Sequence, residues 1–485
     1  MKRRAKIVAT IGPSSESRES LSALIQAGID VARLNFSHGS HEEHQSKIKL
    51  IRELSTEFNK PISILQDLQG PKLRVGTLPK EGVPLTVGEV LNMELDLDNR
   101  PLDFIDGKEK TIFLEIPNIL HSLKVGGRIL LDDGELEMEV LEVYSRGFKA
   151  RVILGGTLHS HKGVNLPGTE LDIPGFTEKD QADLEFGLEM GIDVIAISFV
   201  RDAEDVNCIR DFIRQKRPAR VNMPIIAKLE LPQAVENLDS ILDAADGVMV
   251  ARGDLGVETS PADVPVIQKR IILAANRKNK LVITATQMLD SMIENPRPTR
   301  AEASDVANAI FDGTDAVMLS GESANGKYPV ESVRMMDAIA LKAESNISDW
   351  GHLYQPTIGK DQDDAFAIAI AARELAHDRE VACIAVFTQY GRSALLQSKA
   401  RPQVPILAFT PIEETYHKLG LYWGVIPYLV PFSSSIEDMI YHVEAALLES
   451  TAMLPGEKVV LISGFPISAM GMPNLALLHT IGSLK

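Results

Sequence analysis

Cysteine is scarce in this chain: of 485 residues only Cys208 and Cys383 are cysteines, and they lie far apart. A large secreted protein stabilised by disulfides carries more of them, so we expect a reducing, cytoplasmic location. Long apolar runs are lacking as well. The basic start is followed by an apolar stretch that ends at Gly12 and Pro13, which is too short for a signal peptide. Since no other apolar stretch approaches roughly 18 residues, we expect no membrane span.

Positive charge is also in deficit, with 50 Lys and Arg against 67 Asp and Glu, a net charge of −17. This is the wrong sign for a protein that binds nucleic acid or anionic lipid through its overall field. We therefore expect no nucleic-acid partner, and any anionic ligand must bind a local basic site. Hydrophobic residues make up 45% and charged residues 24%, as in globular proteins, and the length predicts about three domains.

One pattern repeats through the first and middle thirds: a short β-branched run, a polar or glycine-rich end, and a segment with helical periodicity. The runs are 6–12, 30–37, 62–67, 193–200, 224–230, 247–254, 281–288 and 316–322. Continuously apolar runs such as 194–197 are typical of parallel strands buried on both faces. A capping-box pattern at Thr177 to Asp180 and a stop at Gly191 bound one intervening helix. The pattern predicts an α/β fold with a (β/α)8 TIM barrel.

Two segments depart from this repeat. From 71 to 166 the helical period gives way to alternating runs such as 90–95, which predicts a β-rich lid inserted over the barrel mouth. A polar linker follows residue 345, and strand-like runs at 381–388, 404–409, 425–430 and 458–463 then alternate with helices. We therefore expect a barrel at 1–70 and 167–345, a lid at 71–166 and a C-terminal α/β domain with a mostly parallel sheet at 346–485.

Polar side chains recur at the ends of the eight predicted strands, where barrels of this kind carry their catalytic groups. They are Thr10; Arg33, Asn35 and Ser37; Asp67; Ser198; Lys228 and Glu230; Arg252 and Asp254; Thr286 and Gln287; and Ser320 and Glu322. Any one of these residues alone would usually be a solvated or paired group. Their recurrence at the same end of every strand predicts an active site.

The residue types indicate the chemistry. Glu230 and Asp254 are hard oxygen ligands of the kind that hold Mg²⁺ or Mn²⁺. Lys228 suits electrostatic stabilisation in phosphoryl transfer, with a Schiff-base amine as the alternative, which the neighbouring carboxylates disfavour. Arg33 is a candidate phosphate ligand, and the glycines of 251–256 allow backbone amides to approach a carboxylate.

The segments 6–13, 33–39, 163–168, 251–256, 285–289 and 296–302 resemble those of the pyruvate kinase family, in collinear order over essentially the whole chain. The resemblance implies transfer of the phosphoryl group of phosphoenolpyruvate to ADP, giving pyruvate and ATP in the last step of glycolysis. It also implies a mobile lid, a C-terminal regulatory domain and, usually, a homotetramer.

Carried over by position, the resemblance makes Lys228 the lysine that stabilises the transition state and Glu230 and Asp254 the Mg²⁺ ligands. The other implied roles are substrate phosphate binding by Arg33; substrate carboxylate binding around Gly253, Asp254 and Thr286; and nucleotide binding by Arg74, Lys162, Asn35 and His38. Thr286, Ser320 and Glu322 could organise a water that protonates the enolate, and the residues do not decide which group gives the proton. On residue type alone, His38 reads as an ordinary surface histidine.

One motif departs from the K⁺-requiring members, which tend to read Asp-Thr-Lys-Gly-Pro-Glu where this chain has Asp67-Leu68-Gln69-Gly70-Pro71-Lys72. Asn35, Ser37 and Asp67 match the K⁺ ligands of the family, with Leu68 in the same motif. Because the ammonium of Lys72 could replace the monovalent cation, we expect activity without K⁺. The alternative is that Lys72 is a solvated hinge residue.

The loop at 388–394 joins a predicted strand to a helix. Its Thr388, Gly391, Arg392 and Ser393 would suit a phosphate at the helix start, although an ordinary turn fits equally well on the residues alone. The family binds effectors at this loop, so a phosphorylated allosteric effector is expected, with a sugar monophosphate and AMP both open. Two alternative functions are a barrel aldolase or lyase that uses Lys228 as its nucleophile, and a catalytically silent subunit that only binds metabolites.

Overall fold

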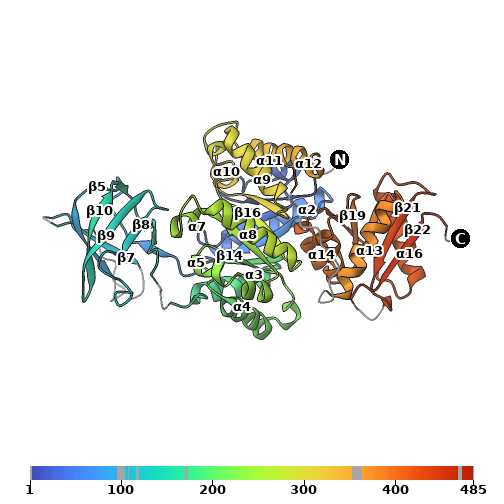
Figure 1. Cartoon of the computed structure of the whole chain (residues 1–485), viewed down its shortest axis with the longest axis horizontal. Coiled ribbons are helices and arrows are strands. Elements are labelled where there is room, and N and C mark those ends of the chain that lie inside the picture. Colours follow the sequence, from blue (N-terminus) through green and yellow to red (C-terminus); the bar gives the residue numbers. More distant parts are fainter. Residues whose placement is uncertain are drawn as a thin grey trace.

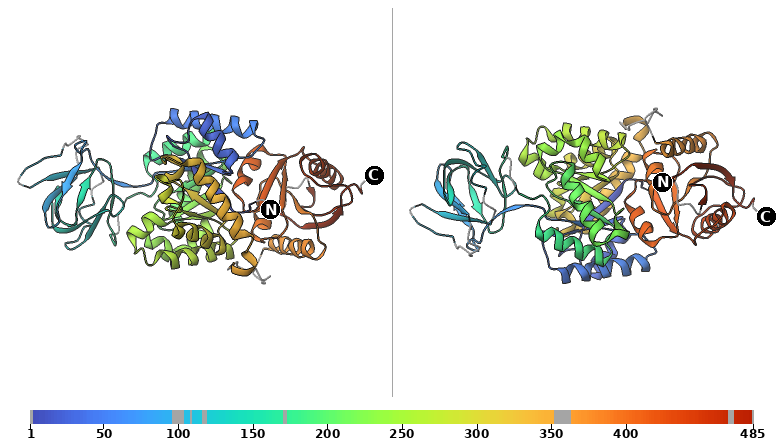
Figure 2. Two further views of the ribbon diagram at one scale, coloured as in Figure 1. Left: turned by 90° about the horizontal axis from the view of Figure 1, so that it is seen from above. Right: turned by 90° about the horizontal axis from the view of Figure 1, so that it is seen from below.

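The computed structural model describes residues 3–95, 104–107, 109–115, 119–169, 173–351, 363–467 and 472–483. The predicted linker lies largely at 352–362, outside the described residues. An eight-stranded barrel occupies the middle of the molecule, between a strand-rich lid and the C-terminal α/β domain (Figures 1 and 2). Within the described parts of the chain, no helix combines the length and apolar character that crossing a membrane requires.

The barrel closes through parallel strands only, which confirms the predicted fold. Around the barrel they are β1 (Lys6–Thr10), β17 (Ala316–Leu319), β16 (Leu281–Ala285), β15 (Gly247–Ala251), β14 (Ile225–Leu229), β13 (Val194–Ile197), β3 (Ser63–Asp67) and β2 (Val31–Asn35). β1 closes the ring on β17, with Lys6 opposite Ala316. Each strand lies inside one of the eight predicted runs. The strands are almost entirely buried because helices cover their outer faces.

Helices return the chain between most of the barrel strands. They are α1 (Arg18–Ala27), α2 (His41–Glu57), α3 (Glu178–Met190), α4 (Ala203–Lys216), α5 (Pro232–Glu236), α6 (Leu238–Ala244), α7 (Arg252–Glu258), α8 (Val264–Arg277), α9 (Arg300–Phe311), α10 (Gly321–Ala324), α11 (Pro329–Glu344) and α12 (Ile347–Trp350). The predicted capping box of α3 forms between Thr177 and Asp180, and the helix ends at Gly191, whose φ of 78° is left-handed.

The lid is a second closed barrel, of mixed strand direction. Its strands are β4 (Leu73–Val75), β6 (Val90–Leu95), β7 (Thr111–Glu115), β8 (Arg128–Leu131), β9 (Leu136–Tyr144), β10 (Gly147–Leu154) and β12 (Gly163–Asn165), while β5 (Val83–Leu85) pairs with β11 (Gly156–Leu158). Alternate residues of β6 are buried, among them Leu91 and Met93. This alternation predicted the strands correctly.

The C-terminal domain has one five-stranded sheet in the order β20 (Val425–Leu429), β19 (Ile406–Thr410), β18 (Cys383–Phe387), β21 (Lys458–Ser463) and β22 (Leu475–Thr480). The first four strands are parallel, as predicted, and β22 adds an antiparallel edge that sequence analysis did not foresee. Its helices are α13 (Asp364–Asp378), α14 (Arg392–Lys399), α15 (Glu413–Lys418) and α16 (Ile436–Ser450).

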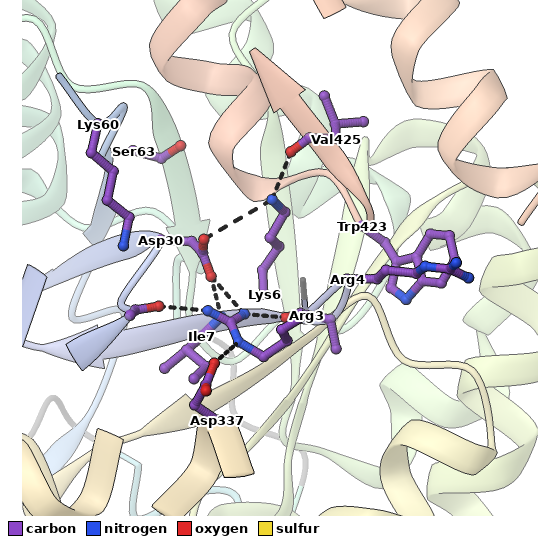
Figure 3. A network of polar contacts seen from close by, with 12 residues as sticks. Arg3, Arg4, Lys6, Ile7, Asp30, Lys60, Ser63, Asp337, Trp423 and Val425 are labelled. Atoms are coloured by element: carbon purple, nitrogen blue, oxygen red, sulfur yellow. Dashed lines mark hydrogen bonds and ion pairs between the residues drawn. The ribbon is translucent and has the colours of Figure 1, made fainter. Parts of the chain in front are cut away.

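A buried polar interface fixes this domain to the amino-terminal ends of the barrel strands. Lys6, the first residue of β1, donates from Nζ to the carbonyl oxygen of Val425 at 2.8 Å (Figure 3). Just before β17, the two oxygens of Asp315 accept from Lys399 at 2.5 Å and from Arg401 at 2.8 Å. The opposite end of the barrel, where the strands terminate, is left for the lid.

Candidate active site

A cavity of about 870 Å³ opens at the carboxyl ends of the barrel strands. The predicted residues that line it are Arg33, Asn35, His38, Lys228, Glu230, Asp254, Thr286 and Ser320. They lie in the last residues of five different strands or shortly after them, and the common direction of those strands brings them to one mouth.

Lys228 lies at the centre of this group. Its Nζ donates to Ser198 Oγ at 2.6 Å and forms ion pairs with Glu230 Oε1 at 2.9 Å and Asp67 Oδ1 at 3.3 Å. Burial alone would lower the pKa of this ammonium, but the two carboxylates outweigh burial and raise it above its ordinary value. A lysine held in its charged form suits electrostatic stabilisation and is a poor Schiff-base nucleophile.

Arg33 and Lys228 share the buried carboxylate of Asp67, which is 1% exposed. Arg33 places Nε and Nη2 each 2.7 Å from Asp67 Oδ2, and its Nη1 donates to Thr10 Oγ1 at 2.9 Å. Burial would raise the pKa of Asp67, yet Lys228 and Arg33 hold it below its ordinary value. Asp67 therefore orients two cations toward the cavity.

Glu230 and Asp254 follow the adjacent strands β14 and β15. Glu230 Oε2 accepts the backbone N–H of Phe199 at 2.7 Å. Burial raises the pKa of Glu230, Lys228 opposes this, and the negative charge of Asp254 adds to it. Among the described residues, no three His, Cys, Asp or Glu side chains form a complete metal cluster. Two carboxylates suit Mg²⁺, which keeps waters and substrate oxygens as its other ligands.

Thr286 and the following Gln287 have left-handed backbones, with φ of 68° and 52°, which is unfavourable for residues other than glycine. Arg252 holds this turn: its Nη2 donates to the carbonyl oxygen of Thr286 at 2.7 Å, and its Nη1 pairs with Asp305 at 2.6 Å. The N–H of Gly253 donates to Thr286 Oγ1 at 2.8 Å. The strained turn thus places the Thr286 hydroxyl beside the glycine-containing start of α7.

Glu322 and Ser320 differ in whether their side chains have hydrogen-bonding capacity left. Both carboxylate oxygens of Glu322 accept backbone N–H groups, from Leu289 at 3.0 Å and from Ser320 at 2.7 Å. Burial raises the pKa of Glu322. Ser320 Oγ is buried and has no hydrogen-bond partner within the described parts of the chain. Glu322 therefore fixes the backbone, while the Ser320 hydroxyl has hydrogen-bonding capacity left.

Ser37, Leu68, Lys72, Arg74 and Lys162 are predicted positions that are not among the residues that line this cavity. Ser37 donates its backbone N–H to Asn35 Oδ1 at 3.1 Å, and Leu68 is buried. Burial lowers the pKa of His38, and the nearby Arg74 and Lys72 lower it further, so this histidine is neutral at pH 7.

The lid contributes three of the predicted cations. Arg74 donates to the carbonyl oxygen of His161 at 2.9 Å, and Lys162 pairs with Asp132 at 2.7 Å. Lys72, at the start of the lid, has its Nζ 3.7 Å from Asp254 Oδ1 and 3.9 Å from Asp133 Oδ1. Of the three, Lys72 is the one in contact with a predicted metal ligand.

A second cavity, of about 680 Å³, lies where the C-terminal domain meets the barrel. The predicted phosphate loop lines it with Thr388, Arg392 and Ser393, and α4 of the barrel adds Arg210 and Arg214. Gly391, at a φ of 85°, donates its N–H to Thr388 Oγ1 at 3.0 Å. The loop therefore opens into a cavity lined by cations from two domains.

Sequence reasoning missed two features of the site. The amide of Phe199 reaches Glu230 from a left-handed backbone with a φ of 55°, and no sequence signal marks that conformation. Asn165 of the lid donates from Nδ2 to Glu258 Oε1 of the barrel at 2.8 Å. The spacing of Glu258, one helical turn after Asp254, was the available signal.

The comparisons with known proteins agree with this geometry. The family model "Pyruvate kinase, barrel domain" matches residues 2–333, and "Pyruvate kinase, alpha/beta domain" matches residues 366–479. The chain is 44% identical over 486 residues to "Pyruvate kinase" of Geobacillus stearothermophilus, covering 100% of this chain and 81% of that one. It is 42% identical over 481 residues to "Pyruvate kinase" of Clostridium perfringens (99% and 100%). It is 44% identical over 492 residues to "Pyruvate kinase 2" of Synechocystis sp. (99% and 80%). With its barrel, lid and polar mouth matched along the whole length, the chain belongs to the pyruvate kinase family of phosphotransferases.

Proposed function

We propose that this pyruvate kinase transfers the phosphoryl group of phosphoenolpyruvate to ADP with Mg²⁺ or Mn²⁺ and without K⁺, under control of an effector bound to the C-terminal domain. The observation that carries the proposal is the cluster of Lys228, Arg33, Asp67 and Glu230 at the barrel mouth. The proposed division is a barrel at 1–70 and 167–345, a lid at 71–166 and a regulatory domain at 346–485. A homotetramer is proposed on the family resemblance alone.

Arg33 is proposed to bind the substrate phosphate, because its guanidinium is held by Asp67 at the edge of the cavity. Lys228 supplies a fixed positive charge where the enolate develops, and Gly253 and Thr286 bind the substrate carboxylate. Glu230 and Asp254 would hold the divalent ion, which when bound neutralises substrate oxygens. Ser320 orders a water for protonation of the enolate, with Glu322 fixing the Ser320 backbone.

The nucleotide is proposed to bind between the lid and the barrel, with Arg74 and Lys162 on its phosphates and Asn35 and His38 beside it. In this role Lys162 exchanges its partner Asp132 for a phosphate oxygen.

K⁺ independence is proposed from Lys72. An ammonium 3.7 Å from Asp254 supplies, without a bound ion, the positive charge that a monovalent cation would bring to these carboxylates. Asn35, Ser37, Asp67 and Leu68 are the other positions of that site.

Thr388, Gly391, Arg392 and Ser393 are proposed to bind the phosphate of the effector. The cations that line the adjoining cavity support an anionic ligand, and its volume of about 680 Å³ suits a sugar monophosphate or a nucleoside monophosphate.

The test is a coupled lactate dehydrogenase assay with Mg²⁺, phosphoenolpyruvate and ADP, run with KCl or tetramethylammonium chloride. We expect pyruvate formation at similar kcat in both salts, and activation by at least one phosphorylated effector. A kcat that collapses by orders of magnitude in tetramethylammonium refutes K⁺ independence. The phosphotransferase assignment itself is refuted by two results together: borohydride traps added pyruvate on Lys228, and the coupled assay detects no pyruvate or ATP formed from phosphoenolpyruvate and ADP.

A further inference from the structure

The lid is an insertion between β3 and α3, so its position relative to the barrel depends on the contacts it makes with the barrel. Two side-chain contacts between them lie next to each other. Lys72 lies 3.7 Å from Asp254, and Asn165 donates to Glu258 at 2.8 Å. Both barrel residues are on α7, the short helix that follows β15.

The two contacts are matched in geometry. Asp254 and Glu258 are four residues apart on α7, which puts them on the same helix face. On the lid, β12 pairs antiparallel with β4, Gly163 opposite Arg74 and Val164 opposite Leu73. Continued by one residue, that register puts Asn165 opposite Lys72. Two neighbouring lid residues therefore meet two neighbouring residues of one helical turn.

The side chain of Lys72 packs against β12 of the lid. It lies across Gly163, where an added Cβ would be 3.1 Å from Lys72 Cε and 3.6 Å from Nζ. The distance between the Lys72 ammonium and Asp254 therefore depends on how close the β4–β12 pair lies to α7. The hydrogen bond from Asn165 to Glu258 holds that same pair against that same helix.

Asn165 is oriented by this bond. The side chain is buried, and its Oδ1 has no hydrogen-bond partner in the described parts of the chain, whereas Nδ2 has Glu258. The neighbouring lid turn also lies against α7: a Cβ added at Gly134 would be 3.7 Å from the side chain of Val257, the residue before Glu258. A sheltered hydrogen bond to a carboxylate is worth more than one in water.

We propose that Glu258 is a positioning residue for phosphoryl transfer: through Asn165 it fixes the lid strands against α7, which sets Lys72 beside Asp254 and holds Lys162 of the lid in position for the nucleotide. The proposal rests on the proposed roles of Lys72, Lys162 and Asp254. It assigns to Glu258 no contact with substrate, nucleotide or metal.

The test compares Glu258→Ala and Asn165→Ala with the wild-type chain in the coupled assay without K⁺, with the melting temperature measured for each. We expect each variant to raise the KM for ADP about tenfold. The KM for phosphoenolpyruvate should stay within about twofold, because its proposed ligands are on the barrel. Displacement of Lys72 should lower kcat as well, so the diagnostic reading is KM: partial unfolding would lower the apparent kcat and leave both KM values unchanged. The double variant should raise the KM for ADP no further than the more impaired of the two single variants, because both changes remove the same hydrogen bond.

Two further variants sharpen the result. Glu258→Gln keeps an acceptor for Asn165 Nδ2 and adds a donor for the unpartnered Asn165 Oδ1, so its KM for ADP should match the wild type. Asp263→Ala removes an exposed carboxylate at the N-cap of α8, five residues beyond α7, and should leave both KM values unchanged.

The proposal is overturned if both alanine variants keep the wild-type KM for ADP, if the KM for phosphoenolpyruvate rises equally, or if Glu258→Gln is as impaired as Glu258→Ala. Lys162→Ala in the same panel separates this failure from that of the proposed nucleotide site. If Lys162→Ala raises the KM for ADP and Glu258→Ala does not, the nucleotide site stands and the role of Glu258 falls. If Lys162→Ala leaves that KM unchanged, the nucleotide assignment and this proposal both fall.

Discussion

Arg252 offers a direct test of whether the strained turn at Thr286 is held in place for catalysis. Arg252→Met keeps an unbranched side chain of similar length and removes the guanidinium. The change deletes the bonds from Arg252 to the carbonyl oxygens of Ala285 and Thr286 and the ion pair with Asp305. The substitution alters none of the residues that are proposed to contact the substrate.

The expected cost has two parts. The Arg252 side chain is 10% exposed but Asp305 is 38% exposed, so the freed carboxylate rehydrates. The loss of unfolding free energy should therefore fall below the 3–5 kcal/mol of a fully buried pair, at about 2–3 kcal/mol. A left-handed residue other than glycine costs about 1–2 kcal/mol, which the untethered turn can recover by relaxing. Relaxation moves Thr286 Oγ1 and should lower kcat/KM for phosphoenolpyruvate about 5- to 30-fold.

Urea unfolding and the coupled assay measure the two parts separately. Asp305→Asn is the matched control, because it weakens the ion pair and leaves the bonds from Arg252 to the turn. It should lose stability while kcat/KM stays within about twofold of the wild type. The reasoning is refuted if Arg252→Met retains wild-type kcat/KM for phosphoenolpyruvate, or if Asp305→Asn loses as much activity as Arg252→Met.

Three other changes have defined outcomes. Lys228→Ala removes an ammonium that the neighbouring carboxylates keep in its charged form, so kcat should fall about 100- to 1000-fold. A loss of kcat under tenfold contradicts the electrostatic role of Lys228. Lys72→Glu replaces attraction to Asp254 by repulsion, so kcat in tetramethylammonium should fall about 10- to 100-fold and KCl should restore part of it; equal rates in both salts contradict the role of Lys72. Burial lowers the pKa of Lys399 to about 8, so between pH 8 and about 10.4 the unfolded chain binds more protons and stability rises with pH. The rise in unfolding free energy over this pH range, at most about 3 kcal/mol, should be missing in Lys399→Met when both proteins are unfolded in urea. The same pH dependence in the variant and the wild type contradicts the lowered pKa of Lys399.

Much of the fold could be predicted because buried parallel strands have a distinctive local pattern. Val194–Ile197 is continuously apolar, and no solvent-facing side interrupts it. β22 was missed although Leu475 to Leu478 form a continuous apolar run. The strand lies half-exposed at the antiparallel edge of the sheet, and such a short run alone does not separate an edge strand from a loop or a helix. The closure of the lid could not be predicted either. β6 pairs in parallel with β7, and neither the alternation of β6 nor the buried run of β7 distinguishes this pairing from an antiparallel hairpin.

The candidate site was also predictable only in part. Residues at strand ends could be predicted because strand direction alone brings Lys228 and Asp254 to one mouth. Which of them would pair could not, because Asp67 binds both Arg33 and Lys228 only through the order of strands around the ring, with β3 between β2 and β13. The bond from Asn165 to Glu258 depends on where the inserted lid comes to rest, and no local pattern encodes that position.

The register that closes the barrel also sets the order in which the chain can fold during synthesis. β1 cannot find β17 until Ala316–Leu319 has left the ribosome, and at roughly 5–20 residues per second that is a wait of roughly 15–60 s. Within the described residues, the strands of the lid pair with one another and not with the barrel, and they emerge in one block, so the lid can form its sheet well before the barrel. A nascent chain of this protein can therefore carry a finished lid while β1, which has β2 on one side, still lacks β17 on the other, and that interval is when chaperones are most needed.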